Sequence, residues 1–398
     1  MDQKVHGQRD ATAVERQPAG RLMKFSFFHL MPWTELTEAP AQWPVNNSGF
    51  DPARGKRLYD SYIDTMAFAE ECGFDWVGCN EHHFSPYGLM ANCNLIGAIL
   101  AQRTKTIRLA MLGNLIPLLN PIRVAEEYAM LDVLSGGRLV AGMIRGVPHE
   151  YIAYNVVPDE SRGRLREAAA LIVKAWTEPE PFGWEGEYYQ YPSVSIWPRP
   201  LQRPHPPILM SASNEESAEF AGTQRAMMAM TLIADLKAAR RCIDAYRASA
   251  RAHGLEPTPD HIVLGYNSLI AETDEEARHY LGEGQRYFHR ILMHPIRDAQ
   301  RLVIQKSRFF GESHGAHGEG FVNRLSMLKE RTIGDMIEAG SVLCGSPATV
   351  LKQMRRVRDE LGNGHFILNM KIGNVPDAVV RRSMELFRDK VRPEARGL

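Results

Sequence analysis

The feature that most constrains the fold of this 398-residue chain is a regular alternation of short apolar segments with longer segments of helical periodicity. Because a helix separates each apolar segment from the next, consecutive strands are expected to run parallel in one sheet. Eight repeats of this unit predict a closed (β/α)₈ TIM barrel rather than an open α/β sheet. The eight expected strands are 24–31, 76–83, 107–116, 138–146, 207–213, 226–233, 261–272 and 365–372.

Two connections are longer than the rest, 32–56 after the first strand and 274–345 after the seventh, the latter read as helical. Both follow a strand, so we expect insertions at the carboxyl-terminal mouth, where barrel active sites lie, and we interpret them as lids. An aromatic- and proline-rich stretch, 182–207, indicates a β-excursion or an ordered surface loop. The polar residues 1–22 are expected to be a disordered extension, and residues 23–398 a single domain.

Composition excludes several classes of function. Lys plus Arg and Asp plus Glu each number 47, so no net charge favours nucleic acid or an anionic membrane. Five cysteines without a CxxC pair argue against a secreted disulfide framework. No run of 18 apolar residues occurs, so no membrane span is expected. We therefore expect a cytoplasmic protein that binds neither nucleic acid nor membrane.

The second strand ends in Glu81-His82-His83. Polar residues at the carboxyl end of a barrel strand are typical of catalysis, although paired core polar groups or a surface loop remain an alternative. Adjacent histidines on a strand point to opposite faces and do not easily chelate one ion. Neither His-x-His nor HExxH occurs here, so the sequence predicts no metal site.

The ends of the fourth and fifth strands together suggest a phosphate site. Arg145 ends the fourth strand, while Ser211, Ser213 and Asn214 end the fifth and open a helix. Free N–H groups and the helix dipole attract an anion to such a terminus, and Arg145 would add a positive charge. The alternative is that Ser213 or Asn214 only caps the helix. No GxGxxG or P-loop motif follows any strand.

Three residues near the first insertion are weaker candidates. His29 lies near the end of the first expected strand, and Trp33 and Trp43 lie in 32–56. Together they could line an apolar substrate pocket. The alternative for the tryptophans is that they only anchor a long loop.

Several segments in combination resemble the bacterial luciferase-like flavin-dependent monooxygenases. The likeness extends over nearly the whole chain from Met23. Any one segment would be a weak signal, whereas their combination at this spacing is specific. The segments are EHHFSPYGL (81–89), NPIRVAEEYAMLDVLSGGRLVAGMIRG (120–146), SASNEESAEFAG (211–222), GSPATV (345–350) and HFILNMKIG (365–373).

The resemblance implies a (β/α)₈ barrel that uses reduced FMN and molecular oxygen. A separate NAD(P)H:flavin reductase would deliver the FMN, and a C4a-(hydro)peroxyflavin would oxygenate a small organic substrate by hydroxylation, Baeyer–Villiger reaction or heteroatom oxidation. It also implies a homodimer. Two alternatives stay open, namely a deazaflavin-dependent oxidoreductase that transfers hydride and a non-catalytic flavin-binding subunit.

The resemblance also implies roles for single residues. His82 would sit beside the flavin and serve catalysis, with Glu81 and His83 as its neighbours. Arg145 and Ser211, together with the helix terminus formed by Ser213 and Asn214, would hold the flavin phosphate.

The third strand of the family passes under the flavin ring with a non-proline cis peptide. By position this bond falls near Leu112-Gly113, followed by Asn114. The chain departs from luciferase where Ile144 replaces a reactive cysteine and Asn120 replaces a histidine. With the longer first insertion, these differences argue against light emission from long aldehydes and leave the substrate open.

Overall fold

The protein is described here by a computed structural model that covers residues 22–231, 233–297, 299 and 331–398. Its centre is a closed barrel of eight parallel strands, in which the last strand of the series hydrogen-bonds back to the first. All eight correspond to predicted strands, so the predicted TIM barrel is confirmed. In barrel order they are β9 (Ile262–Ile270), β11 (His365–Lys371), β1 (Lys24–His29), β2 (Trp76–Cys79), β3 (Arg108–Leu115), β4 (Leu139–Ile144), β7 (Ile208–Ser211) and β8 (Met227–Met230).

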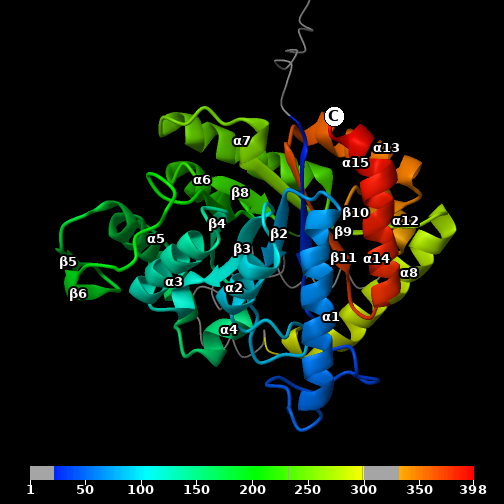
Figure 1. The fold of residues 1–398 in the computed structure, drawn as a ribbon, viewed down its shortest axis with the longest axis horizontal. Coiled ribbons are helices and arrows are strands. Elements are labelled where there is room, and N and C mark those ends of the chain that lie inside the picture. Colours follow the sequence, from blue (N-terminus) through cyan, green and yellow to red (C-terminus); the bar gives the residue numbers. More distant parts are fainter. Residues whose placement is uncertain (1–21, 232, 298, 300–330) are drawn as a thin grey trace, which may run out of the picture.

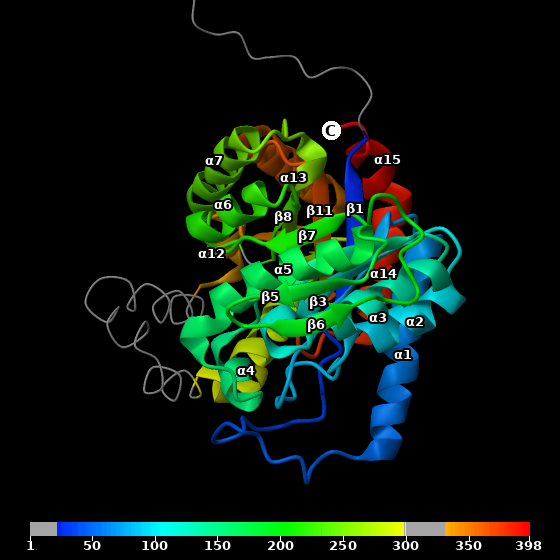
Figure 2. The same ribbon diagram turned by 90° about the vertical axis from the view of Figure 1, so that its left-hand side faces the viewer.

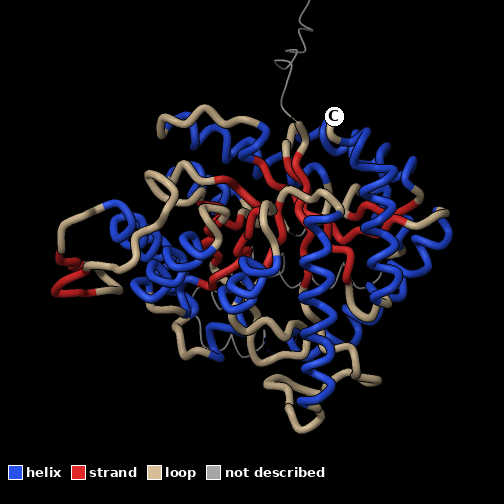
Figure 3. Tube along the Cα trace, viewed as in Figure 1, coloured by secondary structure: helices blue, strands red, loops and turns tan. Residues whose placement is uncertain are grey.

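Helices surround the strands on the outside of the barrel (Figure 3). The long ones are α1 (Pro52–Glu71), α2 (Cys93–Arg103), α3 (Pro121–Leu134), α5 (Ser161–Thr177), α6 (Glu215–Thr223), α7 (Leu236–Ala252), α8 (Asp274–Tyr287), α13 (Pro347–Leu361) and α14 (Asp377–Leu386). Shorter helices are η1 (Ile116–Leu118), α4 (Pro148–Ala153), η2 (Pro158–Glu160), η3 (Pro259–His261), η4 (Phe288–Leu292), α12 (Ile333–Glu338), η6 (Phe387–Val391) and α15 (Arg392–Ala395).

Local sequence explains where many helices begin. The Asn92 side chain accepts the N–H groups of Asn94 and Leu95 at the start of α2. Asn120 caps α3 in the same way, and Pro121 occupies its first turn, where no N–H donor is needed.

The core between strands and helices is aromatic and aliphatic. Phe25 of β1, for example, is fully buried and stacks on Phe366 of β11.

The stretch 182–207 contains an antiparallel hairpin of β5 (Phe182–Glu185) and β6 (Gln190–Val194). This confirms the expected β-excursion, which projects from the barrel at the left of Figure 1. Glu167 of α5 anchors it by accepting hydrogen bonds from the Trp184 indole and from the backbone N–H groups of Tyr188 and Tyr189.

Two predicted boundaries were wrong. The first helix begins at Pro52, not at residue 56, so the first insertion is shorter than expected. Within 274–345, read as helical, β10 (Val342–Gly345) is a strand that pairs with the end of β9. Its four residues are too few for a periodic signal, and long-range pairing with Asn267–Ile270 makes them a strand.

The described parts of both insertions meet at the mouth of the barrel, the lower side of Figure 2. The Tyr287 hydroxyl donates to the carbonyl of Leu36 over 2.9 Å, and His294 Nδ1 lies 3.1 Å from the carbonyl of Pro40. The remainder of the second insertion, 300–330, and the tail 1–21 lie outside the described residues. Over the described chain, no helix is both long and apolar enough to span a membrane.

Glu70, near the end of α1, holds the chain that leads into β3. Its carboxylate accepts hydrogen bonds from the backbone N–H groups of Lys105, Thr106 and Ile107 and from the Thr106 hydroxyl. Burial alone would raise the pKa of Glu70, but these hydrogen bonds favour the charged form and lower the pKa to about 2.

We therefore expect Glu70→Gln to destabilise the protein by about 1–2 kcal/mol at pH 7, after allowance for partial exposure to solvent. A depressed pKa gives stability that is complete above about pH 4.5 and is lost as the pH falls towards 2. Urea unfolding should therefore show a difference between variant and wild type that shrinks over this acid range. Glu71→Gln, which changes the adjacent exposed carboxylate, is the control. A difference that does not depend on pH would contradict the assignment.

Candidate active site

The site is built from the carboxyl ends of four consecutive barrel strands, β2, β3, β4 and β7. In a barrel of parallel strands these ends lie on one rim. The rim therefore carries the residues at or just after the end of each strand. His82 follows β2, Arg145 follows β4 and Ser211 ends β7. The Leu112-Gly113 peptide lies in the second half of β3.

His82 makes a close pair with a carboxylate that sequence reasoning missed. Its Nδ1 lies 2.9 Å from Oε1 of Glu150, and Glu150 Oε2 accepts the backbone N–H of Val147. The Glu150 carboxylate is fully buried, whereas the His82 side chain is 15% exposed. Burial alone would raise the pKa of Glu150, but the facing His82 and these hydrogen bonds outweigh it and lower the pKa.

Glu81, expected as a neighbour of His82 in the site, pairs instead with His83. Its Oε1 lies 3.1 Å from His83 Nε2, and His83 Nδ1 lies 3.1 Å from the Tyr154 hydroxyl. Burial raises the pKa of Glu81, and the hydrogen bond and charge of His83 offset the rise only in part. Because side chains alternate along an extended segment, the two adjacent histidines have separate carboxylate partners.

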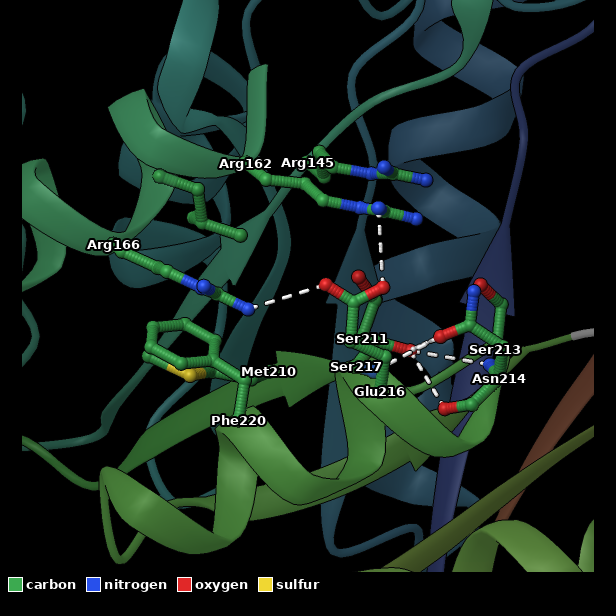
Figure 4. Close-up of a pocket in the computed structure, with 11 residues that line it drawn as sticks. Arg145, Arg162, Arg166, Met210, Ser211, Ser213, Asn214, Glu216, Ser217 and Phe220 are labelled. Atoms are coloured by element: carbon green, nitrogen blue, oxygen red, sulfur yellow. Dashed lines mark hydrogen bonds and ion pairs between the residues drawn. The ribbon is translucent and has the colours of Figure 1, made fainter. Parts of the chain in front are cut away.

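A cluster of charged and hydroxyl side chains forms a pocket at the ends of β4 and β7 (Figure 4). The cavity measures about 40 Å³, which is enough for one compact group of a few atoms. The sequence-predicted residues Arg145, Ser211, Ser213 and Asn214 all line it. Further lining residues are Arg162, Leu165, Arg166, Met210, Glu216, Ser217 and Phe220.

Three arginines give this pocket its positive charge. Burial lowers the pKa of Arg162, the nearby charge of Arg145 lowers it further, and Glu216 opposes both effects. None of the ion pairs between described residues involves Arg145. Sequence reasoning missed Arg162 and Arg166, because charged residues four apart on a helix usually mark a solvated face.

The polar side chains at the start of α6 differ in whether they are already hydrogen-bonded within the protein. Asn214 caps α6, and its side chain accepts the N–H of Ser217 over 2.9 Å. The capping interpretation is thus correct for Asn214. In the described part of the chain, no hydrogen bond uses the hydroxyls of Ser211 or Ser213, which leaves both available to a ligand.

The peptide bond between Leu112 and Gly113 is cis, as the family resemblance implied. The backbones of β3 and β4 approach closely here, because a Cβ atom at Gly142 would overlap the carbonyl oxygen of Met111. The Asn114 side chain is buried and exchanges hydrogen bonds with the Asn94 amide of α2. Its amide is therefore turned to the helix layer.

The three weaker candidates are not brought together. Trp43 is buried, its ring 5.7 Å from that of His149 on α4. Trp33 packs on Phe50, within the same insertion.

His29 packs on Tyr62 of α1, with ring centroids 4.6 Å apart, and its Nδ1 accepts the Met31 N–H. Burial, followed by the charge of Lys371, lowers the pKa of His29 to about 3. His29 thus lies at the carboxyl end of β1, where its imidazole is buried against α1 and its neutral form is favoured. No group of three or more metal-ligating side chains is present among residues 22–297 and 331–398, as far as these are described.

Comparison with known proteins points to one family. The model of the family described as luciferase-like monooxygenase matches residues 43–363. The chain is 37% identical over 198 residues to protein y4wF of Sinorhizobium fredii. It is 34% identical over 175 residues to the oxygenase component of the flavin-dependent trigonelline monooxygenase of Acinetobacter baylyi. These matches cover 49% and 43% of this chain, but only 57% and 48% of the relatives' lengths.

Solved structures show the same fold. Monooxygenase RslO1 from Streptomyces bottropensis superposes with a TM-score of 0.71 at 27% identity, covering 94% of this chain and 99% of that one. The oxygenating constituent of 3,6-diketocamphane monooxygenase from Pseudomonas putida, in complex with FMN, gives 0.70 at 20% identity with the same coverage. An F420-dependent secondary alcohol dehydrogenase gives 0.65 at 15% identity, also with the same coverage. At such identity these last two similarities concern the fold alone.

Proposed function

The chain belongs to the luciferase-like monooxygenase family, and we propose that it is the oxygenase component of a two-component monooxygenase. In this proposal it takes reduced FMN from a separate NAD(P)H:flavin reductase and uses O₂ to oxygenate a small organic substrate. The observation that carries the proposal is the three-arginine pocket on the same barrel rim as the His82–Glu150 pair. The trigonelline relative, an oxygenase component by name, supports the separate reductase.

The pocket fits the phosphate group of FMN in charge and in size. A phosphate monoester carries a charge of about −1.5 to −2 at neutral pH and binds best to guanidinium groups. Arg145, Arg162 and Arg166 supply such groups, and Ser211 and Ser213 supply hydroxyl donors. The small cavity suits one compact anionic group.

When bound, reduced flavin supplies the electrons that activate oxygen. The chain's own part is to bind, to exclude water and to move a proton. With Nδ1 of His82 held by Glu150, the neutral imidazole keeps its proton on Nδ1 and leaves Nε2 free to accept or return one. The contacts between 32–56 and α8 restrict access of water to the mouth, the role we assign to the lids.

The first prediction from this proposal concerns Arg145. We expect Arg145→Ala to weaken FMN binding on the order of 10-fold or more, because a charge-assisted contact to phosphate is lost. Binding of riboflavin, which lacks the phosphate, should change little. Fluorescence titration of both flavins measures the effect, and Arg203→Ala, at a site away from the pocket, is the control.

Equal affinities of the wild type for FMN and riboflavin would contradict the phosphate assignment. Titration with the deazaflavin F420 tests the alternative cofactor. Tighter binding of F420 than of FMN would replace the monooxygenase proposal with hydride transfer, and binding of neither would argue against a flavin site.

The second prediction concerns the proton-handling pair. Anaerobic protein with reduced FMN is mixed with oxygenated buffer, and flavin oxidation and hydrogen peroxide are followed. In the wild type, oxidation should be slower than that of free reduced FMN. Both His82→Ala and Glu150→Gln should accelerate peroxide release on the order of 10-fold, because proton transfer is no longer controlled. His279→Ala, on the exposed surface of α8, should behave as the wild type. Unchanged kinetics in His82→Ala would contradict its role.

A homodimer is the remaining part of the proposal. The outer faces of α2 and α3 expose an apolar patch made of Leu95, Ile99, Met130, Val133 and Leu134, each between 41% and 66% exposed. The two helices pack side by side, so these exposed apolar residues lie on neighbouring helices of the outer layer. Large exposed apolar areas are typical of surfaces that bind another protein. A second copy of the chain is the partner we propose for it.

Replacing Leu95 and Leu134 together by Glu should convert the dimer to a monomer, because unpaired charges would be buried in the proposed interface. Sedimentation velocity measures the mass. Leu22→Glu, an exposed leucine outside the patch, should leave it unchanged. A wild type that sediments as a monomer would contradict the dimer.

A further inference from the structure

One acidic residue lies inside the arginine pocket. Glu216, in the first turn of α6, bridges Arg162 and Arg166, the two pocket arginines that lie on α5 (Figure 4). Its Oε2 lies 3.1 Å from Nη1 of Arg162, and its Oε1 lies 3.2 Å from Nη2 of Arg166. Each carboxylate oxygen thus contacts one Nη group of a guanidinium that an anionic ligand would also use.

A purely stabilising role explains this arrangement poorly. The side chain of Glu216 is 46% exposed and those of Arg162 and Arg166 are 32% and 52% exposed. Ion pairs with this much solvent contribute little to stability. Neighbouring Glu215 makes a similar pair with Arg241 of α7, outside the pocket, so the helix is tied to its surroundings without Glu216.

We propose that Glu216 is an internal competitor for the flavin phosphate, which sets how tightly and for how long the cofactor is held. This inference rests on the function proposed above. Three guanidinium groups and one carboxylate leave two net positive charges, which balance a phosphate dianion. Arg145 makes no ion pair with the described residues and offers the first contact, while the Nη groups of Arg162 and Arg166 that Glu216 holds become available to the phosphate as Glu216 moves aside.

Such a competitor suits an oxygenase that receives flavin from another protein. In each cycle reduced FMN must enter and oxidised FMN must leave, so very tight phosphate binding would slow turnover. Glu216 lowers the affinity by occupying two of the donors and by repelling the phosphate at short range. Both effects act on the phosphate and neither on the flavin ring.

The test compares oxidised FMN with riboflavin in fluorescence titrations of the full-length wild type, Glu216→Gln, Glu216→Ala and the control Glu215→Gln. We expect both Glu216 variants to bind FMN on the order of 10-fold more tightly, because a repelling charge near the phosphate is removed. Riboflavin affinity should not change, and Glu215→Gln should match the wild type. The gain should shrink at about 1 M salt, where such interactions are screened.

Stopped-flow displacement of FMN gives a second readout. The dissociation rate should fall in both Glu216 variants by roughly the factor by which affinity rises, since affinity changes at one site act mostly through dissociation. Thermal unfolding checks that each variant is folded. Agreement between the Gln and Ala variants separates loss of charge from loss of shape.

Unchanged or weaker FMN binding in both Glu216 variants would overturn the inference, since Glu216 would then merely position the arginines. An equal gain for riboflavin and FMN would overturn it as well, because the effect would not pass through the phosphate. In either case a wild type that prefers FMN to riboflavin leaves the proposed function intact. A wild type without that preference overturns both.

Discussion

Hydrogen bonds between β8 and β9 close the sheet, and this closure decides where every other part of the molecule can lie. In a closed parallel barrel all carboxyl ends share one rim. Segments remote in sequence, such as 81–83 and 211–214, are therefore brought to the same rim. The close approach of the β3 and β4 backbones at Gly142 belongs to the same geometry, because only a residue without a side chain fits there.

Burial of acidic groups at this rim imposes a second condition. A buried carboxylate is costly unless it has a charged or hydrogen-bonded partner. Glu150 and Glu81 both meet the condition through a histidine, one each. Each histidine lowers the pKa of its carboxylate, but this outweighs the effect of burial only at Glu150, so that the pKa of Glu150 is lowered and that of Glu81 is raised. His82 retains some exposure at the rim, whereas His83 and Glu81 are both buried. This difference is why the proposal assigns proton transfer to His82 and Glu150.

The arginine pocket also needs compensation of buried charge. Burial first, and then the nearby charge of Arg145, lower the pKa of Arg162, so a negative charge close by favours its charged form. Here Glu216 supplies part of it from within the chain. If FMN binds as proposed, its phosphate neutralises the remaining positive charge. The same electrostatic attraction then contributes to the affinity for the cofactor.

The sequence by itself determined the order of strands and helices and therefore the barrel, because apolar periodicity is a local property. It also marked Arg145 and Ser211, which stand at strand ends. It could not assign β10, whose four residues become a strand only by pairing with β9. Nor could it choose the carboxylate for His82, since Glu150 lies 68 residues away and the adjacent Glu81 faces elsewhere. In the sequence alone, nothing distinguishes three of the pocket residues from an ordinary exposed helix face, namely Arg162, Arg166 and Glu216. Only tertiary packing, which sets distances between residues far apart in the chain, placed them in one pocket.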